Sequence, residues 1–184
     1  MMLIFHMKKQ YITKLIALAV LCGTFAVQAV AVPPSQLLTP VSPALTPPPL
    51  ALKNVDGKTI DIKDLKGKVV LINFWATWCP PCRKEMPSIQ KLTTKFKNKG
   101  LVVLAVNAQE DEDKIFAYIN ALEPVPEFTV LMDKRGKAMS QWGIQGLPSS
   151  YILNKKGKVV YRVLGGREFN SANIINKIEE LIQE

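Results

Sequence analysis

Two nearly continuous runs of β-forming, apolar residues constrain the fold of this 184-residue chain more than any other feature. They are Lys68–Trp75 (KVVLINFW) and Leu101–Ala108 (LVVLAVNA). A strand that is apolar at successive positions is typical of a sheet whose two faces are both covered. The segment between them, Cys79–Lys99, has a helical pattern with an early proline. This order of strand, helix and strand predicts an α/β fold.

Shorter elements surround these two strands and continue the alternation. The sequence predicts a hairpin with its turn at Asp56-Gly57, because such a dipeptide between two β-rich runs is a strong hairpin signal. The expected shorter elements are strands at Leu50–Asn54 and Thr59–Ile62, a helix at Asp111–Leu122, a strand at Thr129–Met132, a helix at Lys137–Trp142, strands at Ser149–Asn154 and Lys158–Val163, and a helix from Ser171 onward. Together they predict an α/β sandwich with a mixed central β-sheet flanked by helices and an N-terminal β-hairpin extension.

Residues 1–31 have the three-part pattern of a secretory signal. Three lysines precede an apolar run, Leu15–Val27, which ends in small residues. We expect either a cleaved signal peptide or an uncleaved membrane anchor, and we disfavour lipidation of Cys22 because Leu21 is too large for a lipoprotein signal. The protein is therefore predicted to be periplasmic or otherwise extracytoplasmic, with an N-terminal anchor in the inner membrane as the alternative to cleavage.

A proline-rich segment follows this signal. Seven of the 13 prolines lie within Pro33–Pro49, with serine and threonine between them. Such a composition favours extended conformations and acts as a semi-rigid spacer. We therefore predict a linker over residues 32–49 and one folded domain over residues 50–184. The linker is either a stalk that holds the domain away from a membrane or an N-terminal segment with no such role.

The chemistry of the domain is concentrated in Cys79-Pro80-Pro81-Cys82. Once residues 1–31 are lost, the chain keeps only these two cysteines and no histidine, which leaves too few ligands for a zinc site. A structural cross-link over two intervening residues removes little entropy from the unfolded chain. We therefore favour a redox dithiol over a structural disulfide or a metal site. No bound cofactor is expected, because the dithiol is itself the redox centre.

The order of the two thiols along the expected helix predicts different roles for them. Cys79 falls at the helix start, where unpaired N–H groups and the helix dipole favour a thiolate. Pro80 suits the first helical position because no hydrogen bond is lost there. Cys82 lies one turn further and should be more buried. Cys79 is thus the predicted attacking thiol, and Cys82 is the predicted resolving thiol.

Two motifs carry a family resemblance. Ile72–Cys82 (INFWATWCPPC) resembles the active-site signature of the thioredoxin superfamily, and in particular its TlpA/ResA-like extracytoplasmic branch, which includes reductases of cytochrome c maturation. Trp142–Leu153 (WGIQGLPSSYIL) is similar to that branch's stretch around its cis-proline. The resemblance implies a thioredoxin-like sandwich and a cis bond before Pro148. It also implies that this loop lies beside Cys79, contacts the partner chain and keeps metals away from the thiols.

One buried position departs from thioredoxin, which has an aspartate two residues before the strand's tryptophan where this chain has Asn73. Asparagine cannot accept the proton of Cys82. The resemblance implies that Glu110 takes this role, since the branch uses a glutamate after the next strand. Such a carboxylate would accept a proton and raise the pKa of the thiols. The alternative is an exposed carboxylate at a helix start. Glu85 is expected to be a solvent-facing charge.

The function predicted from these features is an extracytoplasmic thiol–disulfide oxidoreductase that reduces disulfides in client proteins, for example in cytochrome c maturation. Its partners would be cysteine-containing clients and a membrane electron donor. The alternatives are a thioredoxin-like metal-binding chaperone or scaffold that uses the same thiols, and a disulfide oxidase or isomerase. The formal charge of +9 is scattered, with no basic stripe interleaved with aromatic residues, so nucleic-acid binding is not predicted.

Overall fold

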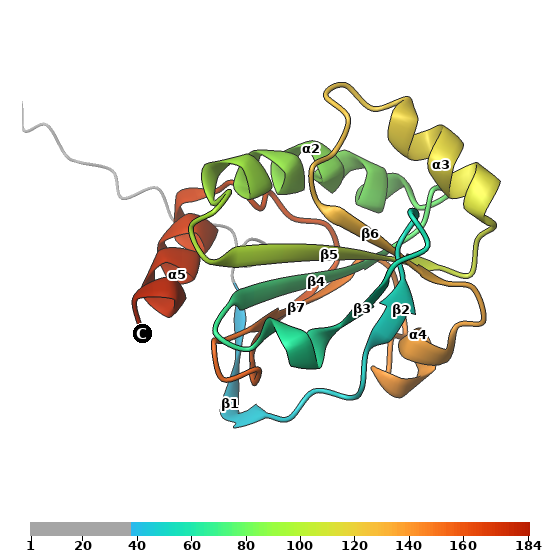
Figure 1. Ribbon diagram of the computed structural model, residues 1–184. Helices are drawn as coiled ribbons and strands as arrows, with labels where there is room; N and C mark the ends of the chain where they lie inside the picture. The colour runs from blue at the N-terminus through green and yellow to red at the C-terminus, as the bar shows by residue number, and fades with distance from the viewer. Residues whose placement is uncertain (1–37) are drawn as a thin grey trace, which may run out of the picture. The chain divides into compact units, whose positions relative to one another are not determined.

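The computed structural model describes residues 38–184, and the predicted signal segment lies outside the described residues. The described chain is built around one six-stranded sheet and one two-stranded sheet (Figure 1). The elements are β1 (Thr39–Leu45), β2 (Ala51–Lys53), β3 (Thr59–Asp61), the 3-10 helix η2 (Ile62–Leu65), β4 (Val69–Trp75), α2 (Pro80–Lys95), β5 (Leu101–Ala108), α3 (Glu112–Asn120), β6 (Thr129–Asp133), α4 (Lys137–Gln141), β7 (Ser149–Leu153), β8 (Val159–Leu164) and α5 (Ala172–Gln183). No helix of residues 38–184 is long and apolar enough to cross a membrane.

The mixed sheet and the hairpin that the sequence predicts are both confirmed. The strand order is β1-β8-β7-β4-β5-β6, with β4, β5 and β6 parallel and β7, β8 and β1 antiparallel to their neighbours. Strands β2 and β3 pair as the predicted hairpin, with Ala51 opposite Asp61. At its turn, the side chain of Asn54 accepts hydrogen bonds from the backbone N–H groups of Asp56 and Lys58.

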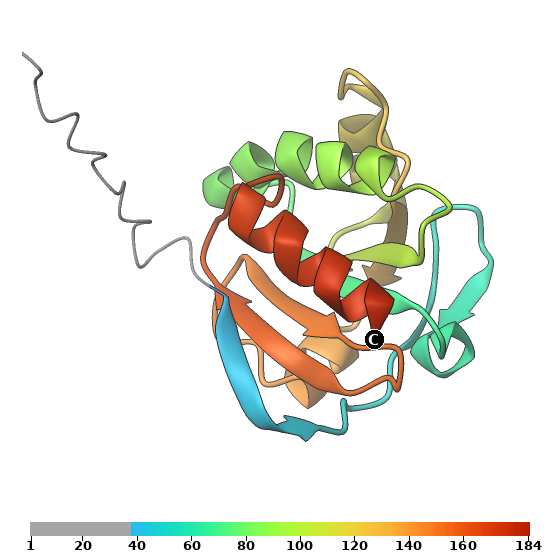
Figure 2. The same ribbon diagram turned by 90° about the vertical axis from the view of Figure 1, so that its left-hand side faces the viewer.

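Helices cover both faces of the large sheet, which explains the apolar strands. Every residue of β4 is buried, and its side chains alternate between two core clusters. One cluster contains buried residues of α2, α3 and α5, and the other contains residues of α4 and of the segment around the hairpin. Figure 2 shows α2 and α5 together on one face of the sheet. Asn73 shares its face with Leu71 and Trp75 and is therefore directed toward α2.

The structure differs from the linker prediction at strand β1, because Thr39–Leu45 falls within the predicted spacer yet pairs with β8. Thr39 lies opposite Arg162, and Pro40 lies opposite Tyr161. An edge strand tolerates proline, since one side of its backbone needs no partner in the sheet. Leu38 also packs into the core. Proline content therefore identified an extended segment but not its place at the sheet edge.

Candidate active site

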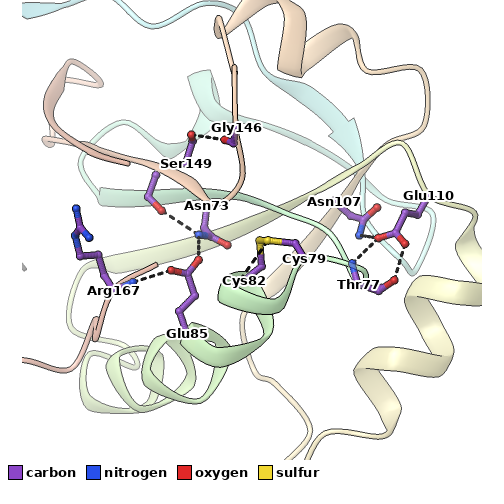
Figure 3. The surroundings of a disulfide bond; sticks show 11 residues. Asn73, Thr77, Cys79, Cys82, Glu85, Asn107, Glu110, Gly146, Ser149 and Arg167 are labelled. Atoms are coloured by element: carbon purple, nitrogen blue, oxygen red, sulfur yellow. Dashed lines mark hydrogen bonds between the residues drawn. A yellow bond between two sulfur atoms is a disulfide. The ribbon is translucent and has the colours of Figure 1, made fainter. Parts of the chain in front are cut away.

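The two cysteines lie where the central strand passes into the helix above it. Strand β4 ends at Trp75, and α2 begins at Pro80, with Cys79 as its N-cap residue. Cys79 and Cys82 form a disulfide (Figure 3). The backbone N–H of Cys82 donates to the sulfur of Cys79 at 3.3 Å. Cys79 is 3% exposed and Cys82 is 0% exposed, so what little surface remains accessible belongs to Cys79.

Pro148 lies at the same end of the sheet as the disulfide. It precedes β7, whose first residue, Ser149, is opposite Phe74 near the end of β4. The Leu147–Pro148 bond is cis, which confirms the geometry that the family resemblance implies. The carbonyl of Pro148 accepts a hydrogen bond from Gly165 at 2.9 Å, so the loop after β8 is tied to the proline.

Glu110 is a buried carboxylate on the Cys79 side of the site. It is 7% exposed, which contradicts the alternative of an exposed helix-start residue. It accepts hydrogen bonds from the backbone N–H of Thr77 at 2.6 Å and from Asn107 at 2.8 Å, and it pairs with Lys114 at 2.8 Å. Burial acts to raise the pKa of Glu110, but the bonds from Lys114, Thr77 and Asn107 outweigh it and lower the pKa. Glu110 therefore holds a negative charge and anchors the segment that leads to Cys79.

Glu85 is a second buried carboxylate, and the prediction that it faces solvent is wrong. Its exposed fraction is 2%. It accepts hydrogen bonds from the side-chain amide of Asn73 at 2.7 Å and from the backbone N–H of Arg167 at 3.1 Å. Burial raises the pKa of Glu85 to about 7, although the bonds from Asn73 and Arg167 and the Arg167 charge oppose the rise. A carboxyl group with this pKa exchanges its proton near neutral pH.

Asn73 lies beside Glu85 and has an unused acceptor. Its amide nitrogen donates to Glu85 and also to the hydroxyl of Ser150 at 2.9 Å. Its carboxamide oxygen is buried and has no hydrogen-bond partner among the described residues. In Figure 3 this oxygen is directed toward the disulfide, and the Asn73–Glu85 pair and the Thr77–Glu110 pair lie on opposite sides of the two sulfurs.

Helical spacing was the signal that could have identified Glu85. Residues three or four apart lie on one face of a helix. Glu85 therefore shares its face with Cys82 and Ile89, which are both fully buried against the sheet. Asn73 points into the same layer from β4. The charge of Glu85 suggested an exposed side chain, whereas the periodicity of its neighbours placed it inside.

Comparison with known proteins identifies the family of this domain. The model of the AhpC/TSA family matches residues 45–162, which is more than half of the chain. The chain belongs to the AhpC/TSA family. The match spans the sheet from the end of β1 into β8 and includes the disulfide, Glu85, Glu110 and Pro148.

Named relatives of this AhpC/TSA-family chain include two thiol-disulfide oxidoreductases called ResA. The protein from Bacillus thuringiensis (strain Al Hakam) is 40% identical over 118 residues, which cover 64% of this chain and 67% of that protein. The protein from Halalkalibacterium halodurans is 33% identical over 132 residues, which cover 72% of each chain. The resemblance to the ResA-like branch is thus confirmed.

Solved structures agree with this assignment. A candidate thiol:disulfide interchange protein DsbE from Chlorobium tepidum matches with a TM-score of 0.69 and 30% identity over 76% of this chain and 96% of that one. StoA from Bacillus subtilis matches with a TM-score of 0.59 and 26% identity over 76% of this chain and 98% of that one. This AhpC/TSA-family chain therefore has a thioredoxin-like fold and is a thiol–disulfide oxidoreductase.

Proposed function

We propose that this protein reduces disulfides of client proteins outside the cytoplasm, with Cys79 and Cys82 as its redox centre. The observation that carries the proposal is the closed Cys79–Cys82 pair at the start of α2, flanked by two buried carboxylates. The extracytoplasmic location is supported by the signal pattern of residues 1–31, as is the anchor that would bring the domain near a membrane electron donor. Maturation of c-type cytochromes is the client pathway that the ResA-like resemblance supports.

The proposed reaction is a pair of thiol–disulfide exchanges. The Cys79 thiolate attacks one sulfur of a client disulfide, and the other client sulfur leaves as a thiolate. The Cys82 thiolate then attacks the Cys79 sulfur of this mixed disulfide, which releases the second client thiolate. Two electrons pass to the client, and the Cys79–Cys82 disulfide is formed. A membrane donor reverses the same steps to restore the two thiols. The loop around Pro148 is proposed to hold the client backbone.

The proposed proton acceptor for Cys82 is Glu85. Its pKa of about 7 allows it to take a proton near neutral pH, and it lies one helical turn from Cys82. In the reduced protein, the unpartnered oxygen of Asn73 is the acceptor toward which the Cys82 thiol can donate. Glu110 suits this role less well, because its lowered pKa keeps it ionised and its oxygens are already bonded to Thr77, Asn107 and Lys114.

A reducing potential is the first expected result. Negative charges beside the thiols disfavour thiolates, and a dithiol whose reduced form is not stabilised is a stronger reductant. We expect the Cys79/Cys82 couple to equilibrate below about −200 mV. The measurement is the oxidised fraction in a series of thiol–disulfide buffers. A value near about −120 mV would instead place the protein among oxidases and would refute the reductase direction.

Substitution of Glu110 tests its electrostatic role. Glu110→Gln removes a negative charge near Cys79, so the pKa of the Cys79 thiol should fall. It also weakens charge-assisted hydrogen bonds to the segment before Cys79, which should cost about 1–3 kcal/mol of the free energy of unfolding. Thiolate absorbance against pH and chemical denaturation measure the two effects. The exposed Glu168→Gln is the control, and a titration identical to the wild type would leave Glu110 with a structural role alone.

A further inference from the structure

A groove runs between α2 and the C-terminal end of α3, and it includes Pro80, the residue after Cys79. It has a volume of about 670 Å³. Its lining residues are Pro80, Arg83, Lys84, Tyr118, Ala121 and Leu122. Pro80 follows Cys79 in the chain, and the ring of Tyr118 packs at 5.5 Å from that of Trp75, the last residue of β4. A client segment attached to Cys79 would therefore have this groove beside it.

A second, more apolar groove continues along α2 and shares Leu122 with the first. It has a volume of about 520 Å³ and is lined on its apolar side by Met86, Pro87, Pro124 and Pro126. The 121–128 loop forms its far wall and is tied to α2 by a hydrogen bond from the backbone of Glu127 to Gln90 at 2.8 Å. In Figure 1 this loop passes from α3 across α2 toward β6. We call the two together the α2 groove.

The charges of the α2 groove near the disulfide are positive. Arg83 and Lys84 are exposed, and within residues 38–184 neither makes an ion pair. The first turn of α2 carries no acidic residue, and Glu85 is turned inward to Asn73. Further along, Lys91 and Lys95 add two more cations to the groove wall, and Lys95 pairs with Glu179 at 3.5 Å.

Acidic side chains are present nearby, but they do not neutralise this end of the groove. Glu112 lies at the start of α3, at the opposite end of that helix from the groove, and binds Lys134 at 3.0 Å. Glu127 pairs with Lys97 at 2.8 Å. Glu123 stands on the wall of the second groove. A ligand that lies over Arg83 and Lys84 therefore meets unpaired positive charge.

We infer that the α2 groove receives an extended, acidic segment of the client protein, next to the client cysteine that bonds Cys79. This inference rests on the proposed reductase function and adds a class of client to it. Arg83 lies one helical turn, about 6 Å, beyond Cys79. An extended chain advances about 3.3 Å per residue. Acidic side chains about two to four residues from the client cysteine would thus face Arg83 and Lys84, and an apolar side chain further on would cover Leu122.

The test compares two disulfide peptides that differ only at the residues two to four positions from the reactive cysteine. One peptide carries aspartate there, and the other carries lysine. For the wild-type protein at about 0.02 M salt, we expect kcat/KM for the acidic peptide to exceed that for the basic peptide about tenfold. At about 0.5 M salt the ratio should approach one, because exposed charges are then screened. A ratio near one at low salt overturns the inference.

Charge reversal assigns the preference to the groove. In Arg83→Glu/Lys84→Glu the ratio should invert, and in Arg83→Gln/Lys84→Gln it should fall to about one. The ratio within each variant cancels any general change in Cys79 reactivity. The matched control is Lys155→Glu/Lys156→Glu, which changes the net charge equally in the turn at the far end of β7.

The outcomes separate this inference from the reductase function on which it rests. The control variant should keep the wild-type preference. An unchanged ratio in the Arg83/Lys84 variants, or an equal loss in the control, overturns the inference while the reductase function stands. Failure of the wild-type protein to reduce either peptide overturns the reductase function itself.

Discussion

Cys79→Ser should abolish the reduction of client disulfides, with a loss of more than about 1000-fold in rate, because a serine hydroxyl is not ionised at neutral pH and forms no disulfide. Cys79 is the N-cap residue of α2 and is the cysteine that retains exposed surface. Alkylation of the reduced wild-type protein at neutral pH should accordingly modify Cys79 before Cys82. The measurements are the rate of peptide disulfide reduction and the order of alkylation found by mass spectrometry.

Cys82→Ala should have the complementary effect and retain the first step while it blocks the second. Covalent complexes with clients should then accumulate, since the Cys79 mixed disulfide has no internal thiol to resolve it. Non-reducing electrophoresis detects these complexes, and mass spectrometry identifies the trapped clients. Cys79→Ser/Cys82→Ala is the control and should trap nothing. Faster alkylation of Cys82, or trapping by Cys79→Ser alone, would reverse the assigned order of the two thiols.

The centre of the fold was predictable because its signals are local and strong. The run Lys68–Trp75 was expected as a strand covered on both faces, and the observed strand Val69–Trp75 is buried throughout. Strand β5 has the predicted bounds, and α2 begins one residue after Cys79, as a cysteine N-cap followed by proline suggests. The motif around the two cysteines therefore already indicated their place at the strand–helix junction.

Properties that depend on distant partners were harder to predict. Glu85 is held inside by Asn73, twelve residues earlier, and by the backbone of Arg167, far along the chain. Strand β1 is defined by its pairing with β8, more than a hundred residues later. Charge and proline content describe a residue's preference in isolation. The exposure expected from the charge of Glu85 was overridden, and the place of the extended proline-rich segment was decided, by contacts that only the folded chain brings together.

The two buried carboxylates have different consequences because their partners differ. Glu110 accepts hydrogen bonds from Thr77 and Asn107 and forms a salt bridge with Lys114, so its negative charge is stabilised. Among the described residues, Glu85 has two donors and no paired cation, and it lies deeper, so its neutral form persists up to about pH 7. One carboxylate is thus suited to hold a permanent charge beside the thiols and the other to gain and lose a proton during exchange.

Glu85→Gln should slow the resolving step about 100-fold, because Cys82 loses its proton acceptor. In the wild-type protein, the rate of mixed-disulfide resolution should rise with pH through about 7 as Glu85 ionises. The variant should lack this inflection and follow the ionisation of Cys82 alone. Stopped-flow reduction of a peptide disulfide at a series of pH values measures this profile. Glu168→Gln, an exposed carboxylate, is the control and should keep the wild-type profile.

The stability of the oxidised protein gives a second readout of Glu85, because the two cysteines do not titrate in the disulfide. Folding raises the pKa of Glu85 from 4.5 to about 7, so the folded protein binds more protons than the unfolded protein between these values. Its free energy of unfolding should therefore fall by up to about 3 kcal/mol as pH rises through this window. Glu85→Gln removes this pH dependence. The free energy of unfolding of the variant should therefore rise relative to that of the wild type as pH increases from about 4.5 to 7, and the difference should persist above pH 7. Parallel stability curves for the two proteins, together with an unchanged pH–rate profile, would exclude Glu85 as the group that exchanges a proton with Cys82.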